Sequence, residues 1–268
     1  MESIPENEKE GLRIRVWQGM ARESRNGMNS VLRPTCFVPF DERRAVRIYQ
    51  RNLPHWRQDG CTYFVTFRLS DSLPDNVRRQ WEEDKKQWLE LHNISYDGER
   101  GRWREAFQRL SPGELFLFEQ HFNRQVQSCL DRGLGECHLR DPACATVLRE
   151  ELLRDDGQRH HLGDFVIMPN HVHLLITPVD DVEPNSFRST KLEQILKSIK
   201  GAAAAACNRL CHRTGSFWQA DSYDHIVRSL EQLSAYREYI AQNPLMLDFQ
   251  LSAEALYRAD WMDAWFQV

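Results

Sequence analysis

Apolar and polar residues alternate in four segments of the chain, and each of these segments predicts a β-strand. Cys61–Leu69 is rich in aromatic and β-branched residues and has a two-residue period. Leu162–Met168 and His171–Thr177 are apolar runs separated by Pro169-Asn170, a turn-favouring pair, so together they predict a hairpin. Ser222–Arg228 is the fourth predicted strand.

The remaining segments place apolar residues three and four positions apart, which predicts helices. The stretch from position 74 to about 155 is too long for a single crossover, so we expect a helical layer or insertion there. Thr190–Arg213 predicts a helix, and Glu231–Asn243 predicts a last one that ends at Pro244, because proline cannot continue a helix.

The order of these elements is strand, helices, strand, strand, helix, strand, helix. It predicts an α+β fold with a ferredoxin-like, split β-α-β antiparallel sheet, helices on one face, and an extra helix after the last strand. Residues 59–245 would form this domain. We expect residues 1–58 to be a basic, partly ordered arm and residues 246–268 to be a C-terminal tail.

Composition places the chain among globular proteins, with 41% hydrophobic and 28% charged residues in 268. It contains no apolar run of membrane-spanning length and begins without a secretory apolar stretch, so we expect a cytoplasmic protein without a membrane partner. The seven cysteines form no CxxC pair, which favours reduced and mostly buried thiols. A zinc site at Cys207, Cys211 and His212 is disfavoured because the last two diverge on a helix.

The net charge of -4 does not favour a nucleic-acid partner, but the distribution of charge softens that objection. From Arg13 to Arg68 there are eleven arginines against four acidic residues, a local excess of +7. From Arg188 to Arg213 six basic residues stand against one acidic residue, an excess of +5. Each run is compatible with a solvated face or with a nucleic-acid surface.

His171 and His173 are the sharpest candidates for chemistry. Residues two apart on a strand point to the same face, so both imidazoles would project together, with Val172 buried behind them. Two imidazoles can bind a divalent metal and leave positions open for a third ligand and for substrate oxygens. The alternative is a pair of histidines on an apolar strand with no ligand.

Tyr239 and Asn243 lie four residues apart in the last predicted helix and therefore share a face. A tyrosine can attack a phosphodiester and form a covalent aryl phosphate, which preserves bond energy for rejoining. The amide oxygen of Asn243 could complete the ligand set of a metal. The alternative for Tyr239 is a packing residue with a hydrated hydroxyl. Tyr236 is a rival nucleophile, and Tyr223 is a weaker one.

Several motifs together resemble the REP-associated tyrosine transposases, a branch of the single-tyrosine HUH transposases. They are, in chain order, YFVTFRL, VIMPNHVHLLITP, KLEQILKSIKG, GSFWQADSYDHIVR and YREYIAQNP. The resemblance spans roughly Tyr63 to Pro244 and is thin through the helical middle. It implies an HUH endonuclease fold.

The resemblance also implies roles for particular residues. His171 and His173 match the metal-binding pair, Tyr239 matches the nucleophile, and Asn243 matches a third ligand, with Mg²⁺ or Mn²⁺ as the metal. The implied activity is cutting and rejoining of single-stranded DNA, often folded into palindromic hairpins, through a 5′-phosphotyrosine intermediate. Monomeric and dimeric forms both occur among such enzymes, and nothing in the sequence decides between them.

Candidate DNA contacts follow from residue type. Lys197, Lys200 and Arg209 could track phosphates, and Trp218 or Phe217 could stack on an unpaired base. The alternative for Trp218 is a core aromatic beside the last strand. We also hypothesise that the arm before Tyr63 contributes hairpin contacts.

Two other classes of protein remain open on the sequence. One is a metal-dependent hydrolase or cupin-like metalloprotein, in which His212, His225 or a carboxylate would join the histidine pair and water would be the nucleophile. The other is a domesticated, non-catalytic DNA-binding module.

Overall fold

A computed structural model describes residues 37–50, 54–97, 103–107, 109–130, 132–179, 191–247 and 250–266. Most of the predicted N-terminal arm lies outside these residues, including the five of its ten arginines that precede position 37. The described part of the arm packs against the domain. Phe37 is buried, the Phe40 amide donates to the Val227 carbonyl, and a hairpin follows.

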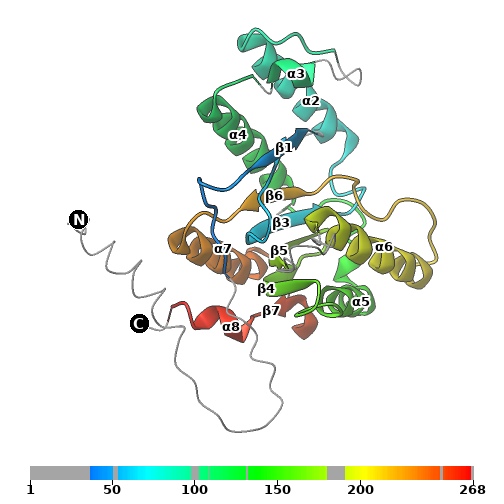
Figure 1. Ribbon diagram of the computed structural model, residues 1–268. Coiled ribbons are helices and arrows are strands. Elements are labelled where there is room, and N and C mark those ends of the chain that lie inside the picture. The colour runs from blue at the N-terminus through cyan, green and yellow to red at the C-terminus, as the bar shows by residue number, and fades with distance from the viewer. Residues whose placement is uncertain are drawn as a thin grey trace, which may run out of the picture. The chain divides into compact units, whose positions relative to one another are not determined.

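Five strands form one antiparallel sheet in the order β6-β3-β5-β4-β7 (Figure 1). The strands are β3 (Tyr63–Arg68), β4 (His160–Ile167), β5 (His171–Pro178), β6 (Tyr223–Ile226) and β7 (Leu256–Tyr257). The four predicted strands are all present. Their order, with helices before β4 and before β6, is that of a split β-α-β layer.

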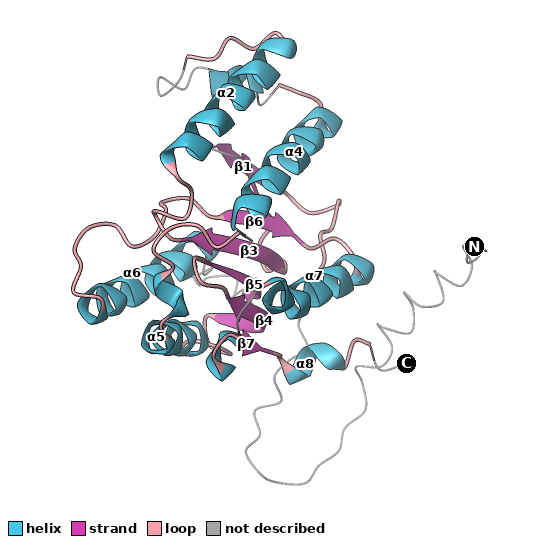
Figure 2. Cartoon of the chain, turned by 180° about the vertical axis from the view of Figure 1, so that it is seen from behind, coloured by secondary structure: helices cyan, strands magenta, loops and turns pink. Residues whose placement is uncertain are grey.

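The sheet is covered on both faces (Figures 1 and 2). Helices α5 (Pro142–Leu153) and α6 (Leu192–Leu210) lie on one side, and α7 (Leu230–Gln242) and α8 (Asp260–Asp263) lie on the other. The predicted extra helix is therefore α7, and it occupies the face opposite to the crossover helices. Both faces being covered explains why β5 is buried along its whole length.

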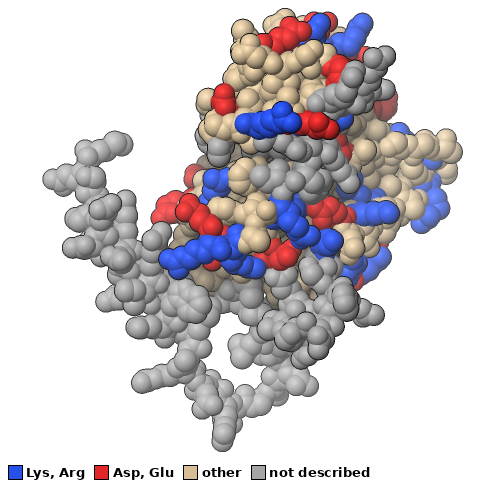
Figure 3. Space-filling model, turned by 45° about the horizontal axis from the view of Figure 1, so that its top comes forward, with Lys and Arg blue, Asp and Glu red and all other residues tan. Residues whose placement is uncertain are grey.

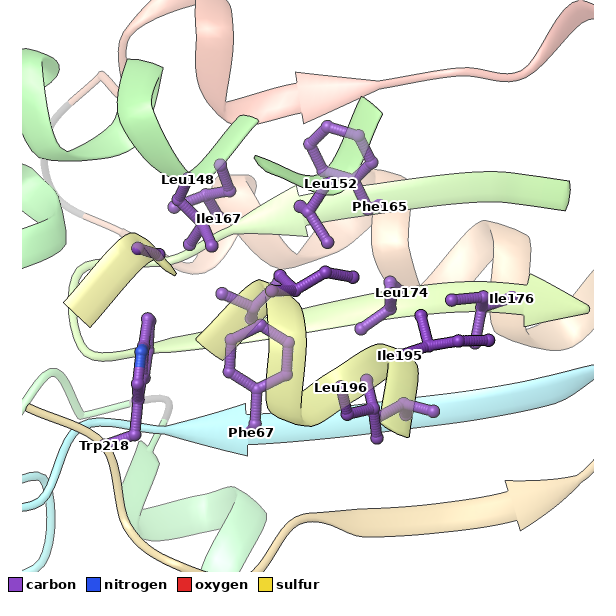
Figure 4. Close-up of a cluster of buried hydrophobic side chains, with 14 of the residues drawn as sticks. Phe67, Leu148, Leu152, Phe165, Ile167, Leu174, Ile176, Ile195, Leu196 and Trp218 are labelled. Carbon is purple, nitrogen blue, oxygen red and sulfur yellow. The ribbon is translucent and has the colours of Figure 1, made fainter. Parts of the chain in front are cut away.

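Side-chain alternation along β5 assigns its residues to two cores. Val172, Leu174 and Ile176 join the cluster under α5 and α6, which also contains Phe67 and Trp218 (Figure 4). Leu175 joins the second cluster, under α7 and α8. The histidines, at alternate positions with Leu175, therefore face α7, and this is the face on which the candidate site lies.

The long helical stretch divides into two parts. Helices α2 (Asp75–Leu91), α3 (Trp103–Phe107) and α4 (Pro112–Leu130) enclose a separate aromatic cluster that includes Trp103, Phe107, Phe118 and Phe122. Figures 1 and 2 both place this group beyond the β6 edge of the sheet. Helix α5 instead packs against α6 and is the crossover helix of the sheet layer. Asp141 caps α5 by accepting from the Ala143 amide.

Short elements complete the chain. They are the hairpin β1 (Arg47–Gln50) and β2 (Pro54–Arg57), and the 3-10 turns η2 (His138–Arg140), η3 (Asn243–Met246) and η4 (Ala253–Ala255). The segment predicted as a C-terminal tail contributes β7 to the sheet edge and buries Ala259 and Met262. No helix in the described ranges has the length and apolar character needed to cross a membrane.

Candidate metal and tyrosine site

His171 and His173 project from β5 onto the same face, as the sequence predicts. Both are fully buried, and their Nε2 atoms lie 2.9 Å apart. Burial lowers the pKa of His171 to about 3, and burial together with the neighbouring His171 lowers the pKa of His173 well below its usual value. Both imidazoles are therefore neutral at physiological pH, which is the form that binds metal ions.

Two polar side chains hold the outer nitrogens of the pair. Asn170 Oδ1 lies 2.7 Å from His171 Nδ1, and Asn170 Nδ2 donates to the Leu134 carbonyl at 2.9 Å. Because the amide nitrogen is engaged with a carbonyl, the Asn170 oxygen accepts from His171 Nδ1–H. This fixes the tautomer that leaves His171 Nε2 with a lone pair.

Thr66 on β3 lies opposite His173 in the sheet, and its Oγ1 is 2.7 Å from His173 Nδ1. A threonine hydroxyl can donate or accept, so it can serve either tautomer of His173. Without a cation, His173 Nε2–H can donate to His171 Nε2. With a cation between the two Nε2 atoms, His173 Nδ1–H would donate to Thr66 instead. The pair can therefore offer both lone pairs to one ion.

Tyr239 faces the histidine pair from α7, with its hydroxyl 3.3 Å from His173 Nε2. Ser229 caps the start of this helix by accepting from the Gln232 amide. Phe64 on β3 stacks on the His173 ring, with centroids 5.6 Å apart, and meets the Tyr239 ring edge-on at 6.0 Å. The strand and the helix thus bring an imidazole and a phenol together around one aromatic ring.

Asn243 is the C-cap of α7, one turn beyond Tyr239, and its backbone N–H donates to the Tyr239 carbonyl. Asn243 is 4% exposed, and its Oδ1 has no hydrogen-bond partner in the part of the chain that the structure describes. A buried acceptor without a donor is costly, and a cation ligated by this oxygen would remove the cost. Imidazole nitrogens suit divalent transition metals and an amide oxygen suits Mg²⁺ or Mn²⁺, so these three side chains are candidate ligands of one divalent ion.

The rival tyrosines have other surroundings. Tyr236, which is also on α7, stacks flat on the Phe64 ring, with centroids 4.2 Å apart and an interplanar angle of 4°. Tyr223 begins β6 and packs against the same apolar cluster. The Tyr239 hydroxyl, for comparison, lies 3.3 Å from His173 Nε2.

The third ligands of a hydrolase-type site are not assembled. Among the described residues, no group of three or more His, Cys, Asp and Glu side chains could hold a metal. His212 is exposed beyond the end of α6, and His225 on β6 lies 3.3 Å from the Gln232 amide nitrogen. Cys207 is buried and Cys211 is half-buried, and neither belongs to a disulfide.

The predicted DNA contacts separate into exposed and structural residues. Lys197 and Arg209 are exposed on α6, whereas Lys200 donates to the Gln219 carbonyl at 2.8 Å. Trp218 is 6% exposed, packs edge-on against Phe67 (Figure 4) and donates from Nε1 to the Lys200 carbonyl. Phe217 is 1% exposed. This placement favours the core-aromatic interpretation of Trp218.

Surface charge is mixed rather than one-signed. On the face shown in Figure 3, basic and acidic side chains are interspersed over the described part of the chain. Among the described arginines of the basic N-terminal run, Arg43, Arg44 and Arg47 are exposed, Arg68 is partly buried and Arg57 is buried. Arg57 contacts both carboxylate oxygens of Asp224 at 2.6 Å.

Sequence reasoning missed the residues that hold the site together. The sequence predicts Asn170 only as part of a turn, and Thr66 and Phe64 only as strand residues. Thr66 is a polar residue in an otherwise apolar strand. A buried hydroxyl needs a hydrogen-bond partner, so this position signals a second polar side chain on the same face of the sheet. No sequence signal pairs Asn170 with the distant Leu134 carbonyl.

The fold and the site together define an α+β protein with a five-stranded antiparallel sheet, a buried histidine pair on a central strand and a tyrosine facing that pair from a helix. No family model matches the chain. An uncharacterised protein of Haemophilus influenzae is 30% identical over 99 residues, which cover 32% of this chain and 54% of that protein. The chain thus spans about half the length of the curated relative that it matches.

Two solved structures are similar to the chain. One is a REP-associated tyrosine transposase bound to a REP hairpin, with a TM-score of 0.32, 14% identity, and coverage of 74% of this chain and 72% of that one. The other, from Deinococcus radiodurans, is described as a transposase, with a TM-score of 0.29, 13% identity, and coverage of 73% and 96%. Likeness at this level carries nothing about the activity of this chain.

Proposed function

We propose that the chain is a metal-dependent, single-tyrosine HUH transposase or endonuclease that cuts and rejoins single-stranded, hairpin-containing DNA. The observation that carries the proposal is the Tyr239 hydroxyl 3.3 Å from Nε2 of His173, the second member of a buried and neutral histidine pair. The sequence resemblance to REP-associated tyrosine transposases supports the same assignment.

Each residue has a defined task in this proposal. His171, His173 and Asn243 would hold Mg²⁺ or Mn²⁺, which when bound supplies a positive charge that polarises the scissile phosphate. Asn170 and Thr66 hold the imidazoles in register. Phe64 and the rest of the apolar cluster under α7 pack against the half-buried Tyr239 ring and fix its position.

The covalent step is a balanced exchange of one phosphate ester for another. The Tyr239 phenol oxygen attacks phosphorus and forms a new P–O bond, while the bond from phosphorus to the 3′ oxygen breaks. The 3′ oxygen ends with the proton that the phenol loses. The products are a 5′-phosphotyrosine and a free 3′-hydroxyl, and reversal with another 3′-hydroxyl rejoins the strand.

Covalent capture tests the proposal directly. The purified full chain would be incubated with labelled single-stranded hairpin DNA, with and without Mn²⁺ or Mg²⁺, and resolved on a denaturing gel. We expect a metal-dependent protein–DNA band that is absent in Tyr239→Phe. Tyr236→Phe is the matched control, because it removes the rival hydroxyl one turn away and should leave the band in place.

The other outcomes identify the competing classes. Hairpin binding without an adduct, with both metals and several hairpins, would indicate the non-catalytic DNA-binding module. Strand cleavage that survives Tyr239→Phe would mean that water is the nucleophile, as in a metal-dependent hydrolase. Loss of the band in Tyr236→Phe but not in Tyr239→Phe would transfer the nucleophile to Tyr236.

A further inference from the structure

Arg68 is the last residue of β3, and it lies directly opposite His171 in the sheet register. It is two positions beyond Thr66, so it projects onto the same face of the sheet as the histidine pair. Side chains paired in this way have Cβ atoms about 5 Å apart. A guanidinium group therefore extends from a position adjacent to the proposed metal ligands.

The Arg68 side chain is partly buried and has no carboxylate partner among the described residues. Its guanidinium donates from Nη1 to Ser72 Oγ at 3.0 Å, which uses one of five N–H donors. The two other buried arginines near the sheet are fully compensated. Arg57 pairs with Asp224 and Glu193, and Arg237 pairs with Asp164 and Asp263.

The pKa of Arg68 reflects its partial burial and the charges near it. Burial and the nearby charge of Arg78 lower the pKa of Arg68 to about 10, while the negative charge of Asp221 acts in the opposite direction. The group is still positively charged at neutral pH. A partly desolvated cation without a counterion is unfavourable, and an anionic ligand would offset the penalty.

We propose that Arg68 binds a phosphate of the DNA strand held at the histidine pair, as a positioning residue that fixes the register of the strand against Tyr239. The inference rests on the proposed function for the identity of the anion. A phosphodiester suits a guanidinium because two parallel N–H donors can contact two phosphate oxygens. The Ser72 contact holds one arm of the group and leaves the remaining donors for the ligand.

Binding measurements separate this role from catalysis. They use the Tyr239→Phe chain, which cannot form the adduct, with Mn²⁺ and a fluorescent single-stranded hairpin read by anisotropy. Arg68→Gln should weaken binding by about tenfold to a hundredfold, the range for a lost hydrogen bond to a charged group. It should also flatten the dependence of log Kd on log salt by about 0.7, the value for one phosphate on a single strand. Arg68→Lys should retain part of the affinity because it keeps the charge.

A set of hairpins with one methylphosphonate each then locates the contact. Neutralising the contacted phosphate should weaken binding by the unsubstituted Arg68 chain and have no further effect on Arg68→Gln. Arg109→Gln is the control, since it removes the same charge from an exposed position between α3 and α4.

Two results would overturn the inference. One is an Arg68→Gln chain that binds as tightly as its parent. The other is an Arg68→Gln chain that binds every methylphosphonate hairpin more weakly than its parent by the same factor and also melts at a lower temperature. That result would show that Arg68 is only structural. Neither depends on adduct formation. If the hairpin binds with Arg68 dependence but no adduct ever forms, the proposed function fails and the phosphate contact stands.

Discussion

At the scale of single residues, the site depends on neutral imidazoles whose orientation is fixed from behind. The histidine pair is completely buried, so neither ring can rely on water to satisfy its outer nitrogen. Asn170 and Thr66 supply those hydrogen bonds. Asn170 is itself fully buried and tied through Nδ2 to the Leu134 carbonyl, so its own rotation is restricted.

Asn170→Ala should weaken metal binding without removing a ligand. The substitution deletes the acceptor that selects the His171 tautomer, and loss of such a partner typically costs 10–100-fold in metal affinity. The measurement is Mn²⁺ titration by calorimetry on the full chain. Asn208→Ala is the control, because that side chain donates to the Gly215 carbonyl far along α6 and should leave Mn²⁺ affinity unchanged. Equal affinities in all three proteins would refute the role assigned to Asn170.

At the scale of elements, helix α8 packs very closely against strand β4 on the face of the sheet that carries the site. A Cβ placed on Gly163 would lie 2.8 Å from Leu175 Cβ and 2.8 Å from Met262 Sδ. Contacts at that distance do not occur between real side chains, so only glycine allows the C-terminal segment to pack against the sheet here. Asp164 beside it accepts from the Ala259 amide and from Arg237 on α7, which ties the segment and the tyrosine-bearing helix to one strand.

Gly163→Ala should destabilise the protein by about 1–3 kcal/mol, the usual range for overpacking a core. Gly201→Ala is the matched comparison, since Gly201 is an exposed glycine in the interior of α6 with open space around its Cβ position. That change should stabilise the protein by up to about 1 kcal/mol because alanine favours the helix. Urea unfolding of both variants measures the two free energies of unfolding. Equal changes in this free energy for Gly163→Ala and Gly201→Ala would contradict the close approach.

At the scale of the whole molecule, a buried charge network ties the N-terminal hairpin to the sheet and to α6. Arg57 on β2 contacts Asp224 on β6 and Glu193 on α6, and His55 contacts the same Asp224 carboxylate at 2.9 Å. Burial alone would raise the pKa of Asp224, but the hydrogen bonds from His55 and Arg57 and the Arg57 charge outweigh it, so the pKa lies below the usual 3.8.

The depressed pKa makes a directional prediction about acid stability. Because the folded pKa of Asp224 is lower than the unfolded one, its contribution is complete above about pH 5 and is lost as the pH falls through the folded pKa. Asp224→Asn should therefore destabilise the protein at pH 7 by about 3–5 kcal/mol, the range for breaking a buried pair, and the difference from wild type should shrink below about pH 5.

Urea unfolding at pH values from 7 down to 3 measures this difference. Asp75→Asn serves as the control, because the pair of Asp75 with Arg78 is exposed and should contribute no more than about 1 kcal/mol at any pH. A constant difference between wild type and Asp224→Asn across the whole range would contradict the assignment.

The basic N-terminal run shows that charge along the sequence does not reveal which arginines are internal and which are available to DNA. Arg57 and Arg68 both belong to the basic run that suggested a DNA surface. Arg57 is internal and paired, and Arg68 lies next to the histidines. The hypothesis that the arm contacts hairpins stays a prediction, and a deletion that tests it should stop before Phe37, because Phe37, Val38 and Phe40 pack against the hydrophobic clusters of the domain.

Local periodicity was sufficient to predict the four main strands, the long α6 and α7, the shared face of His171 and His173, and the turn between β4 and β5. These features depend on residues within a few positions of one another, and side-chain direction repeats every 2 residues in a strand and about 3.6 in a helix. The candidate ligands and Tyr239 follow from that periodicity together with the resemblance.

Only the tertiary structure decided which groups meet. Nothing local requires the Tyr239 hydroxyl to lie at His173, the Asn170 amide to reach the Leu134 carbonyl, or β7 to pair with β4. It also placed Trp218 in the core and, within the described ranges, left Arg68 without a paired carboxylate. The physical reason is that burial and pairing depend on contacts between residues far apart in the chain, and packing selects these contacts only when the whole sheet and its two helical layers come together.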